Sequence, residues 1–87
     1  MKRYNIYYQK YNIFANDYIW YVKVVHTDDI YHEIGKMICT SIEKIKSISY
    51  TEPLASQEEC EKYWTENGYK KLFDNVWSLG RERKDDE

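Results

Sequence analysis

The stretch Tyr18-Ile19-Trp20-Tyr21-Val22-Lys23-Val24-Val25-His26 combines β-branched and aromatic residues with a single charged lysine. Residues of these kinds favour extended structure, so the stretch is predicted to form a β-strand. Side chains alternate between the two faces of a strand, and here both faces are mostly apolar. Because an edge strand usually alternates with polar residues, this pattern predicts a central strand with a neighbour on each side.

A second strand is predicted just before this one, over residues 3–14. Tyr4, Ile6 and Tyr8 recur there with a period of two, which is typical of a strand. The intervening Ala15-Asn16-Asp17 tolerates turn conformations, so the two strands are predicted to form a β-hairpin.

A first helix is predicted to begin after Thr27-Asp28-Asp29, because hydroxyl and carboxylate oxygens accept hydrogen bonds from the free N–H groups of a helix start. Its apolar stripe, expected to lie on the sheet, has steps of three and four residues: Ile30, Ile34, Met37, Ile38, Ile42 and Ile45. Gly35 interrupts the stripe and either allows close approach to a strand or is a tolerated weakness.

A short third strand is predicted over residues 47–52, where Pro53 stops it, and its brevity indicates a sheet edge. A second helix is predicted from Gln57, because Ser56-Gln57-Glu58-Glu59 fits the capping-box pattern. Its inward face is expected to carry Cys60, Tyr63 and Trp64, and Asn67-Gly68 is expected to end it.

Residues 69–79 fit a helix, a single strand or a short hairpin turning at Asp74-Asn75, and we favour a strand because Val, Trp, Phe and Tyr prefer extended structure. The sequence thus predicts one α+β domain over residues 1–79, of order β-β-α-β-α-β, with an antiparallel sheet and two helices packed on one face. Residues 80–87 are predicted to be a charged flexible tail.

The composition indicates a small cytoplasmic domain that does not bind a membrane. The chain has 87 residues and ten tyrosines, so it carries more rings than a thin core can bury. No apolar run approaches the roughly 18 residues of a membrane span. Cys39 and Cys60 fall in segments with helical spacing, and we expect both to be reduced and structural, although a disulfide between them stays open.

Residue types that bind divalent metals or transfer protons crowd the junction between the central strand and the first helix. They are His26, Asp28, Asp29, His32 and Glu33. Helix capping already explains the two aspartates, and no ligand motif of defined spacing is present. We therefore expect no catalytic residue, metal or cofactor, and an enzyme using this cluster is the third hypothesis.

Tyrosines in the first hairpin alternate with Lys2, Arg3, Lys10 and Lys23, a combination that can stack bases and hold phosphates. A nucleic-acid-binding module is therefore the alternative function. The spacing does not match the pattern of an RNA-recognition sheet, and tyrosine is equally enriched at protein interfaces. We therefore favour a protein partner.

Acidic residues gather on the second helix, where they form either a solvated face or a docking patch for an arginine-rich groove. The residues predicted to contact a protein partner are Tyr7, Tyr11, Tyr21, Glu58, Glu59, Glu61 and Glu66.

In general character the chain resembles the small phage and mobile-element proteins that disarm host defences, anti-CRISPR inhibitors among them. The resemblance rests on a compact α+β domain, a tyrosine-rich sheet, an acidic helix and a Lys/Ile/Asn/Tyr bias, and it involves no shared motif. It implies a non-enzymatic, stoichiometric inhibitor that occupies a surface of a nuclease or effector complex, in the host cell if the protein is phage-encoded.

Overall fold

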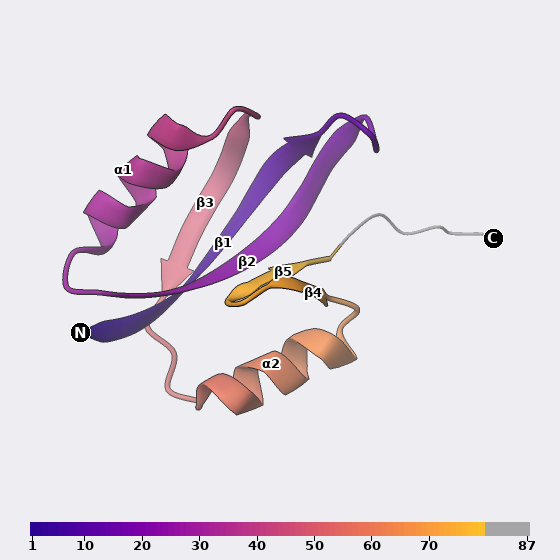
Figure 1. The fold of residues 1–87 in the computed structure, drawn as a ribbon. Coiled ribbons are helices and arrows are strands. Elements are labelled where there is room, and N and C mark those ends of the chain that lie inside the picture. The colour runs from indigo at the N-terminus through magenta and orange to yellow at the C-terminus, as the bar shows by residue number, and fades with distance from the viewer. Residues whose placement is uncertain (80–87) are drawn as a thin grey trace.

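The computed structural model describes residues 1–79, and the tail predicted for residues 80–87 lies outside the described residues. The elements are β1 (Lys2–Asn12), β2 (Asp17–Thr27), α1 (Ile30–Thr40), β3 (Ile45–Thr51), α2 (Gln57–Glu66), β4 (Lys70–Phe73) and β5 (Val76–Ser78). The five strands form one antiparallel sheet in the order β3-β1-β2-β5-β4 (Figure 1). The α+β class and the antiparallel sheet are therefore confirmed.

The strand β2 lies at the centre of the sheet, as its two apolar faces predict. It pairs with β1 from Lys2↔Thr27 to Asn12↔Asp17, and with β5 around Val22↔Trp77. In the hairpin turn, the side chain of Asn12 accepts hydrogen bonds from the N–H groups of Phe14 and Ala15.

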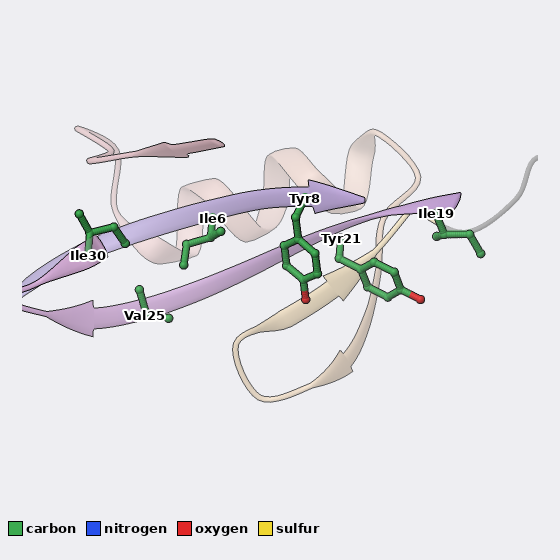
Figure 2. Close-up of a cluster of buried hydrophobic side chains, with 6 residues drawn as sticks. All are labelled: Ile6, Tyr8, Ile19, Tyr21, Val25 and Ile30. Carbon is green, nitrogen blue, oxygen red and sulfur yellow. The ribbon is translucent and has the colours of Figure 1, made fainter. Parts of the chain in front are cut away.

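The helix α1 packs on one face of the sheet. That face carries the even-numbered residues of β1 and the odd-numbered residues of β2, which the register places opposite one another. Figure 2 shows the buried cluster that these residues form with the first residue of α1: Ile6, Tyr8, Ile19, Tyr21, Val25 and Ile30.

The helix α2 packs on the opposite face, so the prediction that both helices share one face is wrong. Val22 and Val24 of β2 point to that side and form a second buried cluster with Trp64 of α2 and Trp77 of β5. The reason is visible in β2 itself: a strand that is apolar on both faces needs cover on both.

The helix α1 ends at Thr40, before the end of the predicted apolar stripe. The Thr40 hydroxyl donates to the Lys36 carbonyl at 2.7 Å, and Ser41 turns extended, with its hydroxyl donating to the Glu43 carbonyl. Ile45 consequently begins β3 instead of continuing the helix. The predicted helix was therefore too long, because local hydroxyl bonds compete with helical ones.

Two further details concern the predicted first helix. Ile38, Cys39 and Ile42 are exposed, so the expected burial of Cys39 in the core is wrong. A Cβ atom built on Gly35 would meet nothing within 4 Å, so this glycine allows no close approach to a strand. Its effect is the weakening of the helix alone.

The helix α2 begins and ends as predicted. The Glu59 N–H donates to the Ser56 hydroxyl at 3.2 Å, while the Ser56 N–H donates to the Glu59 carboxylate at 3.1 Å. Gly68, with φ of 92°, follows the helix in the left-handed region. Trp64 is buried and Cys60 half-buried, but Tyr63 is exposed, so its predicted inward placement is wrong.

Residues 70–78 form a hairpin, which adds one strand to the predicted order. The turn lies at Asp74-Asn75, where Asn75 has φ of 67°, as the hairpin alternative requires. The Asn75 carbonyl accepts from the Val24 N–H at 2.8 Å, which fixes the hairpin beside β2. The strand β3 lies at the sheet edge, as its brevity predicts. Within residues 1–79, no helix has the length and apolarity that crossing a bilayer requires.

Candidate functional site at the β1–β2 turn

The most exposed apolar side chains near the β1–β2 turn come from two connections that are distant in sequence. Ile13 and Phe14 in the turn are 68% and 95% exposed, and Ile42 in the α1–β3 loop is 96% exposed. The Tyr11 N–H donates to the Lys44 carbonyl at 2.9 Å, which holds the loop beside the turn (Figure 1). We call this end of the molecule the tip surface: Tyr11, Ile13, Phe14, Tyr18, Ile42, Lys44 and Lys46.

A groove of about 510 Å³ crosses the tip surface. It is lined by Tyr11, Ile13, Tyr18, Ile42, Glu43 and Lys44. Its volume falls within the roughly 300–1,000 Å³ of ordinary ligand pockets, which is enough for side chains of a partner.

The two tyrosines of the groove are held in fixed positions. The rings of Tyr11 and Tyr18 meet edge to face, with centroids 5.4 Å apart and planes at 78°. The Tyr11 hydroxyl also donates to the side-chain oxygen of Asn16 in the turn. A surface that is ordered before binding loses less conformational entropy when a partner arrives.

Lysines surround this apolar surface. The Lys46 ammonium lies 3.8 Å from the centroid of the Tyr18 ring, a cation–π contact. Lys10 lies 3.8 Å from the carboxylate of Glu43 and so balances the acidic residue of the groove. Within the described part of the chain, neither Lys44 nor Lys46 has a carboxylate within ion-pair distance. The tip surface is therefore apolar with a positive margin.

Among residues 1–79, the helix on this face, α2, is too short to cover the tip surface. The helix has ten residues and a length of about 15 Å, whereas the 11 residues of β1 extend about 36 Å. Trp64 and Cys60 of α2 belong to the buried cluster that includes Tyr7 and Val24. That cluster contains no residue of β1 or β2 closer to the β1–β2 turn than Tyr7 and Val22. Figure 1 shows α2 at the end of the sheet opposite the β1–β2 turn.

Of the three predicted tyrosine anchors, only Tyr11 belongs to the tip surface. Tyr7 is half-buried against the Trp64 cluster. Tyr21 is 7% exposed and stacks on Tyr8 with centroids 5.5 Å apart, so its predicted role as an exposed anchor is wrong. Its odd position in β2 turns it toward the α1 face. Burial, together with the nearby Tyr21, raises the pKa of Tyr8 to about 12.

Some tyrosines are exposed as expected, but they lie elsewhere. Tyr31 of α1 and Tyr50 of β3 are exposed neighbours, with the Tyr50 hydroxyl donating to the Tyr31 hydroxyl at 2.9 Å. This hydrogen bond raises the pKa of Tyr50. Tyr63 is exposed on α2.

The predicted acidic residues lie on α2, apart from the tip surface. Glu58, Glu59 and Glu66 are exposed, and Glu59 also serves the capping box. Glu61 is half-buried and accepts from the Gln57 side chain at 3.0 Å. The fold therefore does not bring the acidic helix and Tyr11 into one surface.

Most of the charged residues between His26 and Glu33 take part in a helix cap or in local ion pairs. The Asp29 carboxylate accepts from the His32 N–H at 3.1 Å, which confirms its capping role. Asp28 lies 3.7 Å from the terminal ammonium, and Glu33 lies 3.7 Å from Lys36. Both histidines are exposed, and residues 1–79 hold no group of three or more His, Cys, Asp and Glu side chains positioned for a metal.

Sequence reasoning missed five residues of the tip surface: Ile13, Phe14, Ile42, Lys44 and Lys46. One signal was available: Ile13 and Phe14, which the predicted strand over residues 3–14 wrongly included, lie in the turn, where two large apolar residues are unusual. The exposure of Ile42 was not predicted, because its spacing fits the apolar stripe of the first helix.

Comparisons with family models, curated proteins and solved structures find no match for this chain.

Proposed function

We propose that this chain is a non-enzymatic protein-binding module that inhibits or modulates its partner by stoichiometric occupation of a surface. The observation that supports the proposal is the position of Ile13 and Ile42, 68% and 96% exposed, in the lining of one groove, with the 95% exposed Phe14 next to Ile13 in the turn. Contiguous exposed apolar surface with a polar margin is typical of interaction sites.

The energetic argument concerns what these three side chains gain on binding. Burying a large apolar side chain contributes roughly 1.5–3 kcal/mol, and a few such residues usually carry most of the affinity of an interface. The isolated chain leaves Ile13, Phe14 and Ile42 in water. A partner that covers all three has enough apolar surface for a specific complex.

The same geometry favours a protein partner over a nucleic acid. Aliphatic side chains offer no ring face to a base, and two of the three exposed apolar side chains of the tip surface are isoleucines. The Lys46 ammonium lies over the Tyr18 ring, and Tyr11 meets that ring edge to face. The face of Tyr18 is therefore partly occupied, and Phe14 is the exposed aromatic ring of the tip surface that remains for stacking.

Nucleic-acid binding is the second candidate, because Lys10, Lys44 and Lys46 lie near aromatic rings at this end of the sheet. It predicts an affinity that falls steeply with salt and weakens when Lys10 or Lys23 becomes Glu. A protein complex anchored by apolar side chains has a weaker salt dependence.

The resemblance to defence inhibitors supplies the first partners to test, namely nucleases and effector complexes that process nucleic acids. An inhibitor of this kind acts at a one-to-one ratio with its target. Titrating the chain into a nuclease assay should therefore give inhibition that saturates at molar equivalence, with no loss of the chain during the reaction.

The experiment that tests the proposal compares three charge-introducing variants in partner binding. Affinity capture identifies the partner, and calorimetry with the purified partner then measures affinity for the wild type, Ile13→Asp, Ile42→Asp and Leu54→Asp. Leu54 is the matched control, because it is fully exposed in the β3–α2 loop at the far end of β3.

We expect Ile13→Asp and Ile42→Asp each to weaken the complex at least about tenfold, and Leu54→Asp to leave it unchanged. Circular dichroism should show that all three variants are folded. A complex that survives both tip variants, or is lost equally with Leu54→Asp, would contradict the proposal.

A further inference from the structure

We infer, on the basis of the proposed function, that the partner docks a segment that carries an apolar side chain flanked by carboxylates. The apolar side chain enters the groove between Tyr11, Tyr18 and Ile42. The carboxylates pair with Lys44 and Lys46 at its margin.

Glu43 is the acidic residue in the groove lining. Its carboxylate lies 3.8 Å from the Lys10 ammonium, so its charge is balanced within the chain. Among residues 1–79, Lys44 and Lys46 have no such acidic neighbour. Their charges are thus available to a partner, and complementary charge requires that partner to be acidic there.

The position of Lys46 suits both contacts at once. Its ammonium lies over the Tyr18 ring, and the ring contact uses only one side of the group. A lysine ammonium has three donors, so it can keep the ring contact and also bind a carboxylate. Lys46 therefore joins the apolar groove to its charged margin.

The edge of the sheet argues for docking through side chains instead of strand addition. Ser47 of β3 has φ of 55°, and the pairing of β1 with β3 shifts register between Tyr7 and Gln9. An irregular edge with a lysine beside it discourages the pairing of another strand. A docking segment next to Lys46 consequently gains its specificity from side chains.

The test titrates the isotope-labelled full chain with three capped peptides and follows amide shifts by NMR. The peptides are Asp-Glu-Leu-Phe-Glu-Asp, its charge-reversed form Lys-Lys-Leu-Phe-Lys-Lys, and the apolar-deleted form Asp-Glu-Gly-Ser-Glu-Asp. A short oligothymidylate of similar charge serves as the nucleic-acid probe. Sedimentation of the chain alone measures self-association.

We expect the acidic apolar peptide to shift the amides of Tyr18, Ile42 and Lys46, and to bind at least about tenfold tighter than the other two peptides. Combined Lys44→Glu and Lys46→Glu should reverse the preference toward the basic peptide. The control Lys62→Glu with Lys70→Glu changes the net charge equally on other elements and should leave the preference intact.

Equal binding of acidic and basic peptides, shifts away from the tip surface, or no peptide binding would each overturn the inference. Tighter binding of the oligothymidylate would overturn it in favour of a nucleic acid, and a dimer that buries Ile42 would assign the groove to a second copy. The proposed function fails separately, since it depends on whether Ile13→Asp and Ile42→Asp release the purified partner.

Discussion

On the sheet face that carries α2, one end of the strands is covered by the helix and the other end is not. At one end Val22 and Val24 lie beneath Trp64 and are buried. At the other end Tyr18 of the same strand and Tyr11 of the neighbouring β1 are only partly buried and border a groove. Whether an apolar residue of a strand belongs to the core or to an exposed groove is thus decided by where the helix ends.

Trp64→Ala, at the covered end, is expected to have the largest effect on the free energy of unfolding. The side chain is 2% exposed and its ring lies 4.8 Å from that of Trp77, so its removal leaves a cavity and should cost about 3–5 kcal/mol. Urea denaturation measures the loss. The control Tyr63→Ala on the same helix should change stability by less than about 0.5 kcal/mol.

A pH-dependent difference is expected for the buried Tyr8. Its pKa in the folded chain is about 12, above the ordinary value of 10.0, so folding favours the neutral phenol. The associated stability is complete below pH 10 and is lost as the pH rises through 12. Urea midpoints across this range should fall less steeply for Tyr8→Phe than for the wild type, and an identical slope would contradict the assignment.

A smaller effect is expected from Ser56→Ala, which removes the cap of α2. The Glu59 N–H then loses its partner, and the free energy of unfolding should fall by about 1 kcal/mol. Ser56→Asp should restore most of it. Because α2 does not reach the tip surface, the affinity for a partner should stay unchanged, and a parallel loss of affinity would show that the two ends are coupled.

The smallest effect on stability is expected from Phe14→Ser. The side chain is 95% exposed, so folding gains little from it, and the change should stay within about 0.5 kcal/mol. Calorimetric binding to the partner should nevertheless weaken clearly. A large loss of stability would instead place Phe14 in the fold and not in the interface.

Much of the fold could be predicted because its signals are local. The doubly apolar run around Val22, the capping box of Ser56 and the left-handed ending at Gly68 each depend on neighbours within a few residues, and all three are confirmed. The end of α1 was predicted wrongly since the hydroxyl bonds of Thr40 and Ser41 outweigh a continuing apolar stripe.

The candidate site was harder to predict because it depends on distant contacts. Tyr11 and Tyr21 look alike in sequence, yet Tyr21 faces α1 and is buried. Ile42 reaches the groove only because the Lys44 carbonyl bonds to the Tyr11 N–H, a contact between residues 33 positions apart. A contact between such distant residues leaves no periodic pattern in the sequence from which it could be predicted.

Asn75 joins three elements that are far apart in the sequence. Its carbonyl accepts from Val24 of β2, and its side chain accepts from Gln57 at the start of α2 at 3.1 Å. The elements β1, β2, α1 and β3 all precede this residue in the chain and therefore leave the ribosome before it. The nascent chain can thus assemble the end that holds Tyr11 and Ile42 first, whereas Val22 is covered only after Trp64 of α2 and Trp77 of β5 have been synthesised.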